Sequence, residues 1–113
     1  MSSLSERLRA KKAKVEPIEI DGETYVVTSK SKGERGRLFA TARRKDGTLN
    51  NERLESILLA ACVTDETGAA ATMEDWDATQ SYITGPLMTK IMSLNGFDKD
   101  DVKDPKDSDS TES

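Results

Sequence analysis

Few side chains in this sequence could carry out acid–base or nucleophilic chemistry. The chain has one cysteine, Cys62, and no histidine, so Ser–His and Cys–His catalysis and zinc sites built on imidazole are excluded. Cys62 falls on the apolar face of a predicted helix, which indicates a buried structural thiol rather than a nucleophile. A single cysteine cannot form an intramolecular disulfide, which favours a reducing cytoplasm. We therefore expect a protein that is not an enzyme, with no catalytic, cofactor-binding or metal-binding residues.

Two acidic groups resemble functional sites in composition only. Residues 98–104 contain four aspartates, but the glycine that a calcium-binding loop needs at its sixth position is missing. Residues 74–77 contain three acids, and these fall in the first turn of a predicted helix, where carboxylates favour the helix dipole. Both groups are interpreted as solvated charge.

Charge is distributed unevenly along the chain, and this distribution predicts its organisation. Residues 1–14 carry five basic side chains against one acid, whereas residues 98–113 carry seven acids against three lysines. The C-terminal segment has a single aliphatic side chain, so we expect a disordered acidic tail. Between the two lies a small domain over residues 15–97, whose core is only marginally stable at this size. A marginal core favours a protein that works with a partner.

The first 15 residues predict a basic helix with a narrow apolar face. Leu4 and Leu8 lie one turn apart and Val15 continues their stripe, while Ser3 or Ser5 can cap the helix. The apolar face is too narrow to hold the helix in place alone, so we expect fraying.

The clearest local signal is a β-hairpin around Asp21-Gly22. This dipeptide separates two alternating segments and specifies a two-residue type I′ turn. In that register Ile18 lies opposite Tyr25. One face of the hairpin is then formed by Ile18, Ile20, Tyr25 and Val27. An isolated hairpin is marginal in water, so this face must lie on helices or join another sheet.

About four short helices are expected after the hairpin. The first begins at a capping box of Ser31 and Glu34 and runs to about Lys45, where Asp46-Gly47 ends it. Its apolar stripe contains Arg35, which we expect to keep its charged head in water.

The second helix is expected to be central to the fold. It begins at Asn50 or Asn51 and runs through Val63. Its broad apolar arc comprises Leu54, Ile57, Leu58, Leu59, Ala61 and Cys62. An arc this broad is typical of a helix that packs on several neighbours.

Two more helices follow a turn at residues 65–68. A short one begins at a capping box of Thr72 and Asp75, and the last begins at Gly85-Pro86 and ends at Asn95-Gly96. The predicted fold class is thus α+β and mostly helical, with an N-terminal β-hairpin.

The last helix carries the candidate partner-binding residues. Its stripe of Leu87, Ile91 and Leu94 is bordered by Met88 and Met92, which widen the apolar arc to about 160° at ~100° per residue. Core packing explains most such stripes, but an adaptable methionine edge also suits varied hydrophobic partners. The hypothesis is that Met88 and Met92, beside buried Leu87 and Ile91, form an exposed binding edge.

The basic N-terminal segment supports an alternative function, a small nucleic-acid-binding or regulatory module. Its five basic side chains are Arg7, Arg9, Lys11, Lys12 and Lys14. However, no aromatic residue is interleaved, the whole chain has a net charge of −4, and no nucleic-acid-binding motif is present. Nucleic acid is therefore disfavoured as a partner. No apolar run approaches the ~18 residues that span a bilayer, so no membrane partner is expected.

The order of these features resembles a known protein family over about residues 4–102. The pattern runs from LSERLRAKKAK through IEIDGETYVV and KGERGRLFA to ERLESILLAACVTDETG, and it ends in LNG before an acidic segment. Its most telling pieces are Glu34-Arg35, the Cys62–Gly68 stretch and Leu94-Asn95-Gly96. The chain resembles the small tail assembly chaperones of long-tailed, siphovirus-like bacteriophages.

This resemblance implies a non-enzymatic role. Such chaperones coat the tape measure protein, keep it soluble and recruit subunits of the tail tube protein. The implied partners are therefore the tape measure protein and the tail tube protein, with self-association of the chaperone as a further expectation. The implied location is the host cytoplasm, and the chaperone is expected to be absent from the mature virion.

Overall fold

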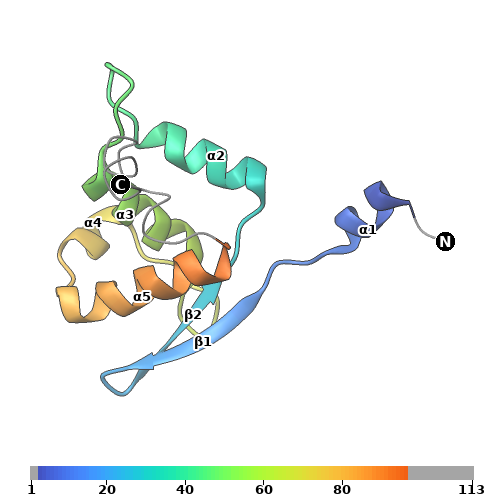
Figure 1. Cartoon of the computed structure of the whole chain (residues 1–113). Coiled ribbons are helices and arrows are strands. Elements are labelled where there is room, and N and C mark those ends of the chain that lie inside the picture. Colours follow the sequence, from blue (N-terminus) through green and yellow to red (C-terminus); the bar gives the residue numbers. More distant parts are fainter. Residues whose placement is uncertain (1–2, 97–113) are drawn as a thin grey trace, which may run out of the picture.

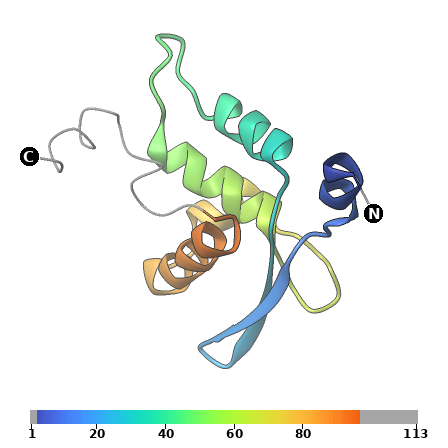
Figure 2. The same ribbon diagram turned by 45° about the vertical axis from the view of Figure 1, so that its right-hand side comes forward.

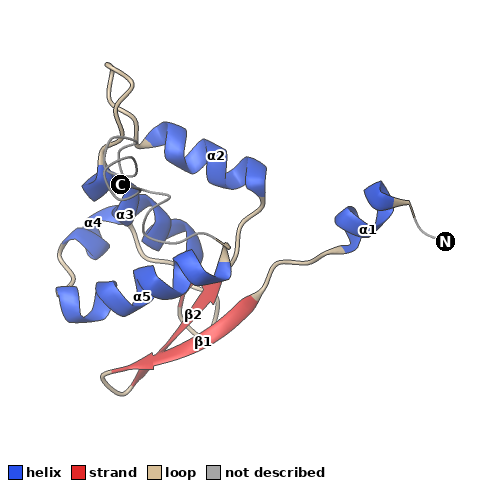
Figure 3. Ribbon diagram, viewed as in Figure 1, coloured by secondary structure: helices blue, strands red, loops and turns tan. Residues whose placement is uncertain are grey.

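The computed structural model describes residues 3–96, which form five helices and one three-stranded antiparallel sheet (Figure 1). In chain order the elements are α1 (Leu4–Ala10), β1 (Val15–Ile20), β2 (Glu23–Thr28), α2 (Lys32–Thr41), α3 (Asn51–Cys62), β3 (Val63–Thr64), α4 (Met73–Asp77) and α5 (Ser81–Leu94). The strand order is β1-β2-β3, and helices predominate over strands (Figure 3). The predicted α+β class is confirmed. The predicted disordered tail, and residue 97 of the predicted domain, lie outside the described residues.

The β1–β2 hairpin has the predicted register and turn. Ile18 pairs with Tyr25, and Asp21 and Gly22 have φ angles of 55° and 80°, as a type I′ turn requires. Val27 is buried, and the other three residues of the predicted apolar face pack against the core. The apolar face packs on helices, and β2 also pairs with β3. The hairpin is therefore stabilised in both of the ways expected from the sequence.

The third strand was not predicted. α3 ends at Cys62, and Val63 turns to extended geometry with φ −112° and ψ 129°. Val63 then pairs with Val27 of β2, and both side chains are buried. The helical pattern was therefore extended one residue too far, because a buried valine fits either element and its pairing partner is 36 positions away.

A tight turn follows β3 and is held by Asp65. The Asp65 carboxylate accepts hydrogen bonds from the Thr67 hydroxyl at 2.6 Å, the Thr67 N–H at 2.8 Å and the Ala69 N–H at 3.0 Å. These bonds, led by that from the Thr67 hydroxyl, hold the pKa of Asp65 below its usual value. The turn is closed by Gly68, whose φ is 90°.

α2 is shorter than predicted. It begins at the expected Ser31–Glu34 capping box but ends at Thr41 rather than near Lys45. Residues 42–50 instead form a loop, in which Arg43 and Leu49 pair through an isolated antiparallel β-bridge. The Asp46 carboxylate accepts from the N–H and hydroxyl of Thr48, so Asp46-Gly47 turns this loop back and does not end the helix.

α5 begins five residues earlier than predicted, at Ser81, and Pro86 lies inside it. The carbonyl of Gln80 accepts hydrogen bonds from Ile83 and Thr84, which closes the first turn ahead of the proline. Pro86 has no N–H, so it cannot donate the helical hydrogen bond to the carbonyl of Tyr82. Tyr82 is exposed, so water can reach this residue. Proline near the start of a helix therefore did not mark its first position.

The C-terminal end of α5 is attached to the connection between β2 and α2. The Asn95 side-chain oxygen accepts from the Lys30 N–H at 2.7 Å, and its amide donates to the Ile91 carbonyl at 2.8 Å. Asn95 thus caps α5 and joins it to a segment 65 positions earlier. The predicted helix end at Asn95-Gly96 is confirmed.

The core is built around α3, as predicted. α3 begins at the cap of Asn50, whose side chain accepts from the Arg53 N–H at 3.2 Å. Figure 2 shows α3 between α2 on one side and α5 on the other. The buried apolar core comprises Val27, Ala42, Leu54, Ile57, Leu58, Leu59, Cys62, Val63, Trp76, Leu87, Met88 and Ile91.

Leu58→Ala is expected to lower the free energy of unfolding by about 2–5 kcal/mol, because it leaves a cavity at the centre of this core. Leu58 is 2% exposed, whereas Leu8, the matched control, is 62% exposed. Chemical denaturation monitored by circular dichroism measures the change. Leu8→Ala should match the parent, and equal unfolding curves for Leu58→Ala and the parent would contradict the assignment of the core.

Candidate partner-binding surface

The methionine edge predicted on α5 is not an exposed surface. Leu87 and Ile91 are 0% exposed, as expected, but Met88 is also buried, at 6%. Only Met92 is partly exposed, and it still packs against the core. α5 contacts both α3 and β2, so its wide apolar arc is covered from two sides. The prediction that Met88 lies on an exposed binding edge is wrong for this reason.

The exposed apolar surface lies instead at the N-terminus, in a segment we call the N-terminal arm (residues 3–14). Among the described residues, the large hydrophobic side chains that are exposed are Leu4, Leu8, Val15 and Tyr82. Leu4 and Leu8 are 63% and 62% exposed, and no residue of α1 is buried. Figures 1 and 2 both show α1 standing away from the rest of the molecule.

α1 is a short helix stabilised by its own cap. The Glu6 N–H donates to the Ser3 hydroxyl at 3.1 Å, and the Ser3 N–H donates to the Glu6 carboxylate at 3.4 Å, which forms a capping box. The helix ends at Ala10, and Val15 belongs to β1 rather than continuing the helical stripe. The predicted helix is therefore present but shorter. With two leucines and no third apolar turn, it has nothing with which to pack onto the core.

The arm is also strongly basic, and its base is anchored to the hairpin. All five of its arginine and lysine side chains are exposed. At its base, the Ser29 N–H donates to the Lys14 carbonyl at 2.8 Å, and the Lys14 N–H donates to the Ser29 hydroxyl at 2.8 Å. The arm thus presents two leucines among exposed positive charges. A shallow hollow on it is lined by Leu4, Arg7, Leu8, Ala10 and Lys11. This combination can bind an apolar and acidic surface.

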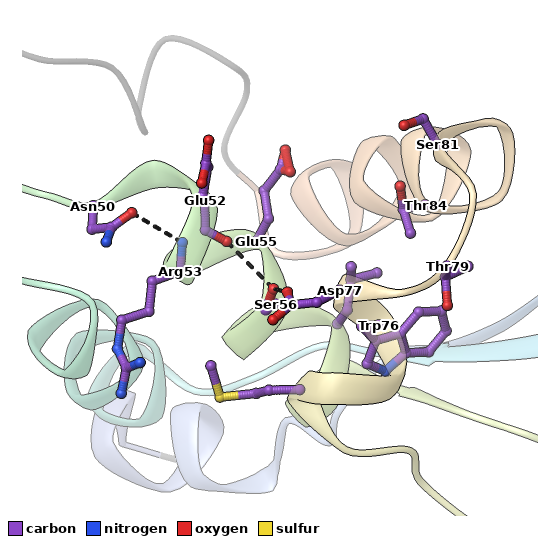
Figure 4. Close-up of a pocket in the computed structure, with 12 residues that line it drawn as sticks. Asn50, Glu52, Arg53, Glu55, Ser56, Trp76, Asp77, Thr79, Ser81 and Thr84 are labelled. Atoms are coloured by element: carbon purple, nitrogen blue, oxygen red, sulfur yellow. Dashed lines mark hydrogen bonds between the residues drawn. The ribbon is translucent and has the colours of Figure 1, made fainter.

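A larger pocket lies between α3, α4 and the start of α5 (Figure 4). Its rim carries Glu52, Arg53 and Glu55, and its depth contains Trp76. The Ser56 hydroxyl donates to the Asp77 carboxylate, which joins α3 to α4. The indole N–H of Trp76 is buried without a hydrogen-bond partner among the described residues.

Cys62 is 1% exposed, and its burial raises the pKa of the thiol to about 11. A thiol this basic stays protonated at neutral pH and is unreactive. The interpretation of Cys62 as a structural thiol is confirmed.

Within residues 3–96, no group of three or more His, Cys, Asp or Glu side chains is placed to hold a metal ion. None of the helices in this range is long and apolar enough to cross a membrane. No family model, curated protein or solved structure matches this chain.

Met88→Lys is expected to lower the free energy of unfolding by more than about 3 kcal/mol, because it places an unpaired charge in the core. Met92→Lys is the matched control on the same helix, and its ammonium can extend to solvent, so a loss below about 1.5 kcal/mol is expected. Thermal denaturation of the two variants measures the difference. Equal stability of both variants would show that Met88 faces solvent.

Proposed function

We propose that this protein is a non-enzymatic tail assembly chaperone of a long-tailed bacteriophage. In this role it binds the tape measure protein in the host cytoplasm, keeps it soluble and recruits tail tube subunits. It leaves before the virion is complete. The proposal rests on the ordered resemblance of residues 4–102 and on the surface chemistry of the N-terminal arm.

The observation that carries the proposal is the exposure of Leu4 and Leu8 on a helix that does not pack on the domain. Exposed apolar side chains on an isolated helix usually mark an interaction site. A short amphipathic helix binds another helix through side chains one turn apart. Leu4 and Leu8 have this spacing, and an elongated helical partner offers matching apolar positions along its length.

The size of this contact suits transient binding. Fully burying a leucine contributes about 1.5–3 kcal/mol, so two leucines give one weak contact per chaperone. Many copies along one long partner can still cover it through multivalency. A set of weak contacts also allows each copy to be displaced as tube subunits assemble.

The exposed basic side chains of the arm favour the alternative function, a nucleic-acid-binding module. Contacts to phosphates would depend on Arg7, Arg9 and the three lysines, and would weaken steeply with salt. Contacts through the leucines would depend little on salt. Substitution of the two kinds of residue therefore separates the two functions.

The double variant Leu4→Ser, Leu8→Ser should lose the ability to keep a co-expressed tape measure protein soluble. The domain itself should remain as stable as the parent, because neither leucine is buried. Tyr82→Ser is the matched control, since Tyr82 is a 59% exposed apolar residue on α5. Fractionation of the co-expressed proteins, with a melting curve for each variant, measures both properties.

Two outcomes would contradict the proposal. Full solubilisation by the double variant would exclude the arm as the contact surface. Failure of the parent to solubilise the partner, together with oligonucleotide binding that an Arg7→Gln, Arg9→Gln variant loses, would favour the nucleic-acid-binding module instead.

A further inference from the structure

The two strongly charged segments of this chain leave the folded domain from neighbouring points. The basic arm ends at Lys14, whose backbone is hydrogen-bonded to Ser29. Lys30, which follows Ser29 in the chain, donates its N–H to the side-chain oxygen of Asn95. Asn95 is the last residue but one of the described chain, so the acidic segment that follows begins close to the base of the arm.

The lengths allow the acidic segment to cover the arm. The links through residues 29 and 30 place the Cα atoms of Lys14 and Asn95 within about 20 Å of each other. Residues 97–113 can span up to about 60 Å when extended. The arm is shorter, because a seven-residue helix is about 10 Å long and the four residues that follow it add at most about 14 Å.

The charges of the two segments are complementary. Residues 1–14 have five basic side chains against one acid, and residues 98–113 have seven acids against three lysines. Because the basic side chains of the arm are exposed, carboxylates can reach them without displacing any part of the core. Contacts of this kind are individually weak and strongly screened by salt.

We propose that residues 98–113 dock on the N-terminal arm of the same chain and cover it when no partner is bound. Carboxylates of the acidic segment pair with the arginines and lysines of the arm, and in doing so they shield Leu4 and Leu8 from other molecules. A partner with larger apolar contacts displaces the segment. The contact itself follows from charge and geometry, whereas its effect on partner binding rests on the proposed function.

A paramagnetic label at residue 110 tests the contact in the 113-residue chain. Ser110→Cys provides the attachment point, because Cys62 is buried and does not compete for the reagent. The label should broaden the amide signals of residues 7–12 at low salt. The amides of Asp21 and Gly22, at the far end of the hairpin, should remain sharp.

A second labelled variant, in which the seven acids of residues 98–113 are changed to Asn or Gln, controls for mere proximity. It should lose the broadening, as should the original labelled protein in 1 M NaCl, where the Debye length is about 3 Å. Broadening that persists in either case would overturn the electrostatic contact.

Two other results would also overturn the proposal. Broadening centred on residues 32–37 of α2 would place the acidic segment on the wrong basic surface. Broadening that appears only when a labelled chain is mixed with an isotope-enriched unlabelled chain would assign the contact to a second copy. Because this experiment contains no tape measure protein, its failure leaves the solubilisation result intact, and the two proposals fail separately.

Discussion

Burial of one face of α3 is the interaction on which the remainder of this small domain depends. Leu54, Ile57 and Leu58 are each at most 6% exposed, and the helix contacts α2, α4, α5 and β3. Each neighbour contributes only a few apolar side chains of its own. Loss of packing on this helix would therefore release the hairpin and the other helices together.

The same constraint explains why the N-terminal arm remains outside the core. Five buried hydrophobic residues of α3 already pack with seven from other parts of the fold, and the hairpin closes the core with Val27. The arm has only Leu4 and Leu8 to offer, on a helix whose other positions are mostly polar or charged. Docking it on the domain would bury little apolar surface while desolvating several basic groups, which is unfavourable. An arm that does not pack on the domain core is thus the lower-energy arrangement.

Local chemistry made much of the fold predictable. The Asp21-Gly22 turn set the hairpin register, and the capping boxes at Ser31 and Thr72 gave the starts of α2 and α4. The predicted element boundaries were wrong where a contact between residues distant in the sequence determined the local structure. Val63 became a strand residue because it pairs with Val27, and Asp46-Gly47 closed a loop that returns to α3.

The candidate surface was harder to predict than the fold. The width of a helix's apolar arc cannot by itself distinguish a helix packed between two elements from one that faces solvent on one side. For this reason Met88 was predicted to be exposed, although it is buried. The correct signal was the isolation of Leu4 and Leu8 among basic residues with no third apolar turn. The three sequence segments that carry the family resemblance include residues that stabilise the fold. Glu34 is part of the capping box of α2, and Asn95 joins the end of α5 to Lys30. They therefore report on the fold more than on the contact surface.

The central claim is that the arm makes the partner contact while the domain serves as its scaffold. Hydrogen–deuterium exchange of the 113-residue chain, alone and bound to the tape measure protein, tests it most directly. The account predicts that binding slows exchange in residues 3–14, while α3 and the hairpin are unchanged. Protection confined to β1 or α5, with the arm exchanging as fast as in the isolated chain, would contradict it.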